Sequence, residues 1–201
     1  MSETRRERRR QEDVDEILTV ALQLFVQQGF HGTSMHQIAE KAEFSVGKLY
    51  TFFPSKEDLF RGLQERGIAE FRTIFETVID DGGRPLDELL KVLRSAFAFA
   101  STKRDIIRVE IAEHLGRALN VKRPIHDLLR DRVRLHLDRA VGNGDLRPLD
   151  TYLLATMILG AGEALVENLA SAEVDDPYAA IPDRIMELMV LPHARKNEVP
   201  R

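Results

Sequence analysis

The residues best suited to binding chemistry gather in one stretch, Thr33 to Lys56, with the sequence TSMHQIAEKAEFSVGKLYTFFPSK. Its second half carries side chains that are small, cationic or hydroxyl-bearing, namely Val46, Gly47, Lys48, Tyr50 and Thr51. Such groups suit a sugar-phosphate wall and base edges, and glycine lets a backbone approach a partner closely. The stretch therefore predicts nucleic-acid contact, although an ordinary surface helix between two longer helices is an alternative reading.

Local helix signals explain how this stretch would be positioned. Ser34 and Gln37 form a capping box that begins a short helix over about residues 35–42. Ser45 caps a second helix, which Pro54 ends because proline disfavours helix in the residue before it. Two short helices joined by a tight turn predict a helix-turn-helix, whose second helix lies in the major groove of DNA.

Composition excludes several other kinds of chemistry. The chain has 201 residues and no cysteine, so disulfides, thiolate nucleophiles and cysteine-bearing zinc sites are absent. It contains no HExxH, nucleophile elbow or glycine-rich phosphate loop, and its six histidines are scattered. We therefore expect no enzyme activity, no metal and no cofactor. No run of 18 uncharged apolar residues and no signal peptide is present, so the expected location is cytoplasmic, without a membrane partner.

The charge distribution is compatible with DNA binding despite a net charge of −4. Residues 1–56 hold 8 Lys and Arg against 8 Asp and Glu, so the remaining residues carry 21 against 25 and the whole deficit. Five arginines between residues 5 and 10 form a basic N-terminal arm, residues 1–11, that could neutralise phosphates. A frayed, solvated terminus is the alternative reading of the arm.

Apolar periodicity predicts an all-α fold of about nine helices in two domains. A helix-turn-helix domain over residues 12–56 precedes a helical effector-binding and dimerisation domain over 57–192 and a tail over 193–201. The expected helices cover about residues 12–28, 35–42, 45–53, 55–80, 86–100, 105–119, 124–141, 149–170 and a last helix through 185–190.

The helix from Tyr152 to Leu169 is too apolar for an ordinary surface helix. Together with the last helix it predicts a four-helix interface between two copies of the chain, with a buried core helix as the alternative. The expected interface residues are Leu153, Met157, Gly160, Ala161, Ala164, Ile185, Leu188 and Met189.

A small-molecule pocket in the C-terminal half is only weakly encoded. Candidates for an apolar lining with a few polar anchors are Phe97, Arg108, Glu110, His114, Tyr152, Met157 and Glu163. Phe97 and Met157 could equally be plain core, and Glu110 with His114 could be a local charge pair.

The N-terminal region resembles the TetR family of bacterial transcriptional regulators, without a gap from about Val14 to Phe60. The resemblance is carried by Ile17-Leu18, Ala21-Leu22, Leu24-Phe25, Gly29-Phe30, Thr33-Ser34, Ile38-Ala39, Ala42, Ser45, Gly47, Leu49-Tyr50, Phe53 and Ser55-Lys56-Glu57-Asp58-Leu59. It implies a homodimeric repressor that binds a palindromic operator in double-stranded DNA. A small-molecule effector would release the repressor from this operator. An all-α enzyme and a protein-interaction module remain the alternatives.

The same resemblance implies roles for single residues. Thr33 and Ser34 would open the positioning helix, residues Ser45 to Thr51 would form the recognition helix, and Tyr50 and Lys56 would hold phosphates. The full set of expected DNA contacts is Thr33, Ser34, Ser45, Val46, Gly47, Lys48, Tyr50, Thr51, Phe52 and Lys56. Family members usually carry glycine at the position of Glu43 and often valine at that of Phe44. Glu43 therefore predicts mild backbone strain or a differently shaped turn.

Overall fold

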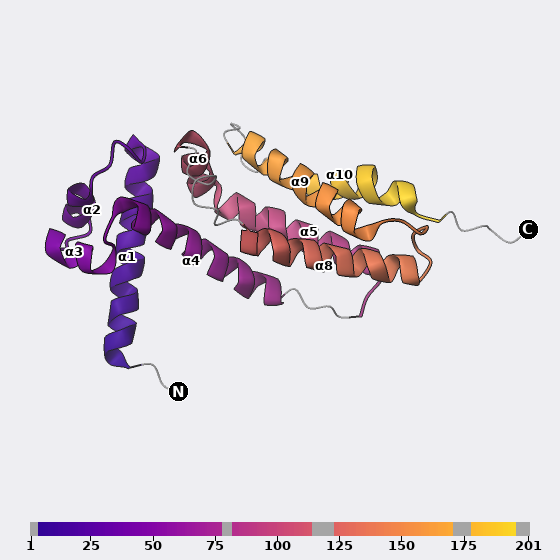
Figure 1. Ribbon diagram of the computed structural model, residues 1–201, viewed down its shortest axis with the longest axis horizontal. Helices are drawn as coiled ribbons and strands as arrows, with labels where there is room; N and C mark the ends of the chain where they lie inside the picture. Colours follow the sequence, from indigo (N-terminus) through magenta and orange to yellow (C-terminus); the bar gives the residue numbers. More distant parts are fainter. Residues whose placement is uncertain (1–3, 78–81, 114–122, 171–177, 196–201) are drawn as a thin grey trace, which may run out of the picture. The chain divides into compact units, whose positions relative to one another are not determined.

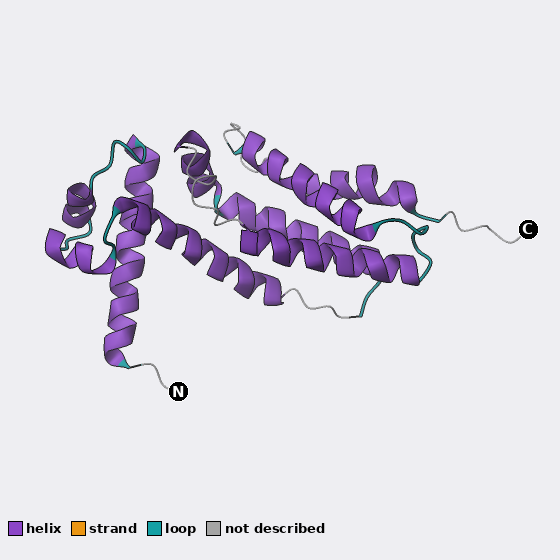
Figure 2. Ribbon diagram, in the orientation of Figure 1, coloured by secondary structure: helices purple, strands orange, loops and turns teal. Residues whose placement is uncertain are grey.

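The computed structural model describes residues 4–77, 82–113, 123–170 and 178–195. These residues form nine α-helices and no sheet, which confirms the predicted all-α fold. Figures 1 and 2 show the helices and the loops between them. The helices are α1 Arg5–Gln28, α2 Met35–Lys41, α3 Val46–Phe52, α4 Lys56–Thr77, α5 Pro85–Thr102, α6 Arg104–Glu113, α8 Arg123–Gly142, α9 Thr151–Leu169 and α10 Ile181–Ile185. The predicted ends of the fourth and sixth helices, 78–80 and 114–119, lie outside the described residues.

Helix α1 begins at Arg5, so the predicted start near residue 12 is wrong. A second capping box causes the earlier start: the Glu7 amide donates to the Thr4 hydroxyl at 3.3 Å, and the Thr4 amide donates to the Glu7 carboxylate at 2.8 Å. The Thr4 hydroxyl also donates to this carboxylate, and these bonds lower the pKa of Glu7 below its usual value. The arginines at positions 5–10 are therefore presented from a helix.

The two short helices have the predicted caps. Ser34 and Gln37 make the expected capping box at the start of α2, and the Ser45 hydroxyl accepts from the Lys48 amide at 3.2 Å at the start of α3. Between them Glu43 has φ 57°, a left-handed conformation that disfavours any residue with a Cβ. The strain expected from the absence of glycine is therefore present in the turn.

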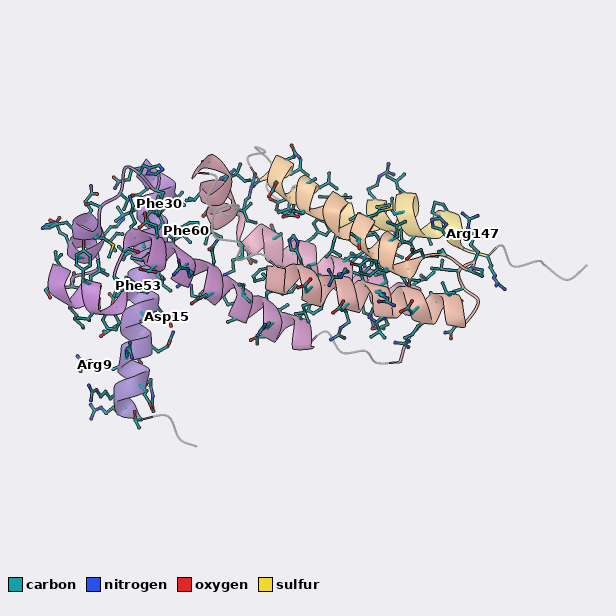
Figure 3. The ribbon with its side chains drawn as sticks, in the orientation of Figure 1. Arg9, Asp15, Phe30, Phe53, Phe60 and Arg147 are labelled. Carbon is teal, nitrogen blue, oxygen red and sulfur yellow. The ribbon has the colours of Figure 1, made fainter. Side chains whose placement is uncertain are left out.

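The described residues cluster in two compact units, and the first comprises those of Met1–Ile68 with Asp105–Val121. Its core contains three mutually packed rings: the Phe25–Phe30, Phe25–Phe60 and Phe30–Phe60 centroids lie 5.2, 6.1 and 5.7 Å apart. Figure 3 labels Phe30 and Phe60 of this group. Leu49 and Phe53 anchor α3 to this core with 0% and 8% of their surface exposed. Burial of these two side chains fixes which face of α3 points outward.

The second unit comprises the described residues of Ala69–Arg104 and Lys122–Arg201. Apolar side chains of α5, α8 and α9 fill its core together with Phe71 and Phe75 from the end of α4. Tyr178 is buried in this core, and its hydroxyl donates to the Val166 carbonyl at 3.1 Å. Helix α4 thus supplies core residues to both units, because Leu59 and Phe60 near its start belong to the first.

The last predicted helix is less regular than expected. Helix α10 gives way to a π-helical turn over Met186–Val190 and a 3-10 turn over Leu191–His193. Two contacts with Arg147 fix the end of this segment. The Arg147 amide donates to the His193 carbonyl at 2.9 Å, and the Arg147 guanidinium (Figure 3) contacts the His193 ring.

Candidate nucleic-acid interface

The outer face of α3 carries the residues predicted to contact DNA. Tyr50 is 47% exposed, the Lys48 side chain is 46% exposed, and Gly47 and Thr51 are also exposed. Only Leu49 of this helix is buried. The structure therefore brings small, cationic and hydroxyl groups together on one solvent-facing surface, which is the arrangement that a recognition helix needs.

Gly47 has no packing partner that would explain the choice of glycine. A Cβ built at Gly47 meets no atom of the described chain within 4 Å. Glycine inside a helix is less stable than alanine by up to about 1 kcal/mol, so the residue is unfavourable for the isolated helix. A glycine here leaves room for a partner to approach the α3 backbone closely.

Lys48 is held by its own chain through three contacts. Its ammonium lies 2.9 Å from the Asp13 carboxylate of α1, 4.2 Å from the Phe44 ring centroid and 5.9 Å from the Phe52 ring centroid. A cation above an aromatic face is attracted by the ring quadrupole. Phe44, which stands where the family often has valine, therefore serves as a platform for Lys48.

The remaining expected contacts on the helix pair occupy mixed positions. Ser34 and Ser45 are exposed, and each hydroxyl accepts a capping bond from a backbone amide. The Thr51 hydroxyl donates to the Lys48 carbonyl at 2.6 Å. Val46 and Phe52 are half-buried against the first core, so their outer edges alone can reach a partner.

Thr33 and Lys56 point inward. Thr33 is 2% exposed, and its hydroxyl donates to the Gly29 carbonyl at 2.8 Å. The Lys56 ammonium donates to the Phe30 carbonyl at 2.5 Å and the Thr33 carbonyl at 2.7 Å, and it lies 4.4 Å from the Phe30 ring centroid. These contacts join the start of α4 to the loop after α1, so both residues have a structural role within the domain.

The first turns of α1 add cations that the sequence analysis assigned to a basic N-terminal arm. The Arg10 guanidinium lies 5.9 Å from the Phe52 ring centroid, which brings this arginine to α3. Arg9 projects from the same part of α1 (Figure 3). The Thr4–Glu7 capping box was the sequence signal for this helical start.

The expected pocket residues have different environments within their own units. Phe97 is buried in the second core, whereas Tyr152 and Met157 are 51% and 53% exposed on α9. Arg108 pairs weakly with Asp105 at 3.9 Å, and Glu163 lies 3.6 Å from the His126 ring of α8. His114 and the Glu110 side chain lie outside the described residues. In the described part of the chain, no group of three His, Cys, Asp or Glu could hold a metal ion.

Most of the expected interface residues are exposed, and four of them lie on one side of α9. Leu153 and Met157 are 54% and 53% exposed, Gly160 and Ala164 continue the same side of α9, and Leu188 is 67% exposed. Ala161 and Met189 are half-buried, while Ile185 is buried in the chain's own core at 4% exposure. The four α9 residues recur at spacings of four, three and four, which places them on one helix face.

Helix α9 is also the one described helix whose length and apolarity would allow it to cross a membrane, and 22% of the window concerned is buried within the chain. One such helix is weak evidence for a membrane span, because the core helix of a soluble protein passes the same test.

The chain resembles proteins of known class. Residues 17–63 match the family described as bacterial regulatory proteins, tetR family. Residues 17–63 form a TetR-family DNA-binding domain. The fatty acid metabolism regulator protein of Bacillus subtilis is 21% identical over 179 residues, which cover 87% of this chain and 92% of that protein.

Solved structures extend the likeness to the whole TetR-type fold. A TetR-like transcriptional regulator from Rhodococcus sp. RHA1 has 26% identity and a TM-score of 0.66, covering 90% of this chain and 94% of that one. FadR from Bacillus subtilis, solved in complex with stearoyl-CoA, has 20% identity and a TM-score of 0.70, covering 88% and 97%. These comparisons identify the chain as a DNA-binding transcriptional regulator, as predicted.

Proposed function

We propose that the chain is a homodimeric repressor that binds a palindromic operator through α3 and leaves it when a small molecule binds the second unit. The observation that carries the proposal is the outer face of α3, where Gly47, Lys48, Tyr50 and Thr51 are exposed around the buried anchor Leu49. Tyr50 and Thr51 supply hydroxyls for phosphates, and Gly47 permits close approach of the helix to the groove. Ser34 and Ser45 add exposed hydroxyls at the two helix starts.

Self-association is supported by the apolar face of α9. Leu153, Met157, Gly160 and Ala164 would pack against the same residues of a second copy in a two-fold interface, with Leu188 at its side. Ala161 and Met189 would lie at the border, and Ile185 would support the face from beneath. A two-fold dimer presents two recognition helices to half-sites about 34 Å apart, as a palindrome requires.

We propose a ligand with a long apolar chain as the first effector to test, and the cytoplasm as the site of action. The support is the likeness to a regulator solved with stearoyl-CoA, together with an aliphatic and aromatic second core that includes Phe97. A Cβ built at Gly162 would lie 3.3 Å from the Phe97 ring, so α5 and α9 approach closely there. A ligand that separates these helices would change the packing around the end of α4, which also belongs to this core.

Selection of genomic fragments at rising salt tests the DNA-binding part. Bulk DNA dissociates as salt rises because its binding rests on counterion release, whereas an operator retains the protein through base contacts. We expect a few fragments containing inverted repeats to remain bound. Uniform loss of all fragments would instead favour the interaction module.

A second experiment tests release. Adding stearoyl-CoA to the retained complexes should dissociate them, with free coenzyme A as the matched control. Retention with both compounds would exclude stearoyl-CoA as the effector while leaving operator binding intact.

A further inference from the structure

The contacts of Lys48 give the recognition helix an internal counter-ion. Asp13 lies two turns into the capped helix α1, with 21% of its side chain exposed, and its carboxylate is 2.9 Å from the Lys48 ammonium. Phe44 and Phe52 flank the same ammonium, at 4.2 and 5.9 Å from their ring centroids. The most prominent cation of the α3 outer face is therefore neutralised before any DNA arrives.

A DNA phosphate would have to compete with this carboxylate. Sequence-independent binding depends on the number of phosphates that lysine and arginine neutralise, and each one releases condensed counterions. A lysine that keeps its carboxylate adds no net charge to such a complex. The Phe44 platform keeps the ammonium beside Asp13, because moving it to a distant phosphate also forfeits the ring contact.

We propose that Asp13 is a specificity-determining residue that competes with DNA phosphates for Lys48 and so lowers sequence-independent affinity. The inference rests on the proposed placement of α3 against DNA. In a complex with DNA of random sequence, moving Lys48 from the Asp13 carboxylate to a phosphate gains little free energy, so Lys48 stays with Asp13. In the operator complex, fixed contacts along α3 hold a phosphate or base edge at Lys48, and the exchange becomes favourable.

The test is a salt titration with a short duplex of random sequence. Asp13→Asn removes the carboxylate charge and keeps the side-chain shape. We expect it to raise affinity about two- to fivefold, the range that corresponds to one exposed ion pair. The slope of log K against log salt should steepen by about 0.9, the contribution of one more neutralised phosphate.

Glu16→Gln is the matched control, because Glu16 is exposed one turn further along α1 and the charge change is the same. It should raise affinity less and leave the slope unchanged. Lys48→Gln should lower affinity, and adding Asp13→Asn to Lys48→Gln should then leave the slope unchanged and raise affinity no more than Glu16→Gln does, because the competition needs the lysine. Circular dichroism of all variants checks that α1 stays folded.

The outcomes separate this inference from the proposed function. Equal effects of Asp13→Asn and Glu16→Gln, or a slope change on Asp13→Asn that persists without Lys48, would overturn the competition while leaving DNA binding by α3 intact. A wild-type chain that binds neither random duplex nor genomic fragments would overturn the proposed function and this inference with it.

Discussion

Replacing Lys56 by methionine separates a structural role from a phosphate-binding role. Methionine retains much of the apolar stem but removes the ammonium, which donates to the Phe30 and Thr33 carbonyls and lies over the Phe30 ring. The Phe30 carbonyl also accepts from the Thr33 amide at 3.3 Å, so the main loss falls on the Thr33 carbonyl. A hydrogen bond from a charged donor contributes about 1.5–3 kcal/mol. Lys56 is half-buried, so we expect a loss of about 2 kcal/mol.

A change of this size is measurable by thermal unfolding. For a chain of this length each kcal/mol lowers Tm by about 2–4 °C, so Lys56→Met should lower Tm by about 4–8 °C. Lys41→Met is the matched control, because Lys41 is exposed at the end of α2 and should leave Tm within about 2 °C. A Lys56→Met protein with unchanged Tm and weakened DNA binding would refute the structural reading and restore Lys56 as a phosphate ligand.

Three further substitutions test other parts of the structure. Tyr50→Ala should lower operator affinity about tenfold in a gel-shift assay without changing Tm, because the exposed ring supports no core contact; unchanged affinity would remove Tyr50 from the interface. Glu43→Gly should raise Tm by about 2–4 °C by relieving the left-handed strain, whereas Glu40→Gly within α2 should lower it. Met157→Glu should shift sedimentation towards a single copy, since it places a charge in the apolar face of α9; a persistent dimer would place the interface elsewhere.

The helix-turn-helix was predictable because its signals are local. Ser34 with Gln37 and Ser45 with the Lys48 amide satisfy helix ends within three residues, so the sequence contains both partners of each cap. The same logic applies to Thr4 with Glu7, and the predicted start of α1 was wrong because the arginines between and after them were interpreted as an arm. Cap chemistry outweighs the repulsion between neighbouring arginines there.

Lys56 and the α9 face show what local patterns leave undetermined. The ammonium of Lys56 binds carbonyls 26 and 23 residues earlier, and no spacing rule indicates that direction. An apolar helix such as α9 has the same sequence pattern whether its own chain or a second copy of the chain covers it. Its half-exposed Tyr152 and Met157 became distinguishable from core residues such as Ile158 only once the neighbouring helices were in place.

Replacing Gly47 should affect the stability of the free protein and its affinity for DNA in opposite directions. Because a Cβ at this position would meet open space, Gly47→Ala should be silent or slightly favourable in every measurement made on the protein alone. The substitution should lower only the affinity for duplex DNA, because the added methyl group would lie between the α3 backbone and the groove. A screen for thermostable variants would therefore select alanine at position 47 and lose operator affinity. Stability and DNA binding must be measured together at this residue.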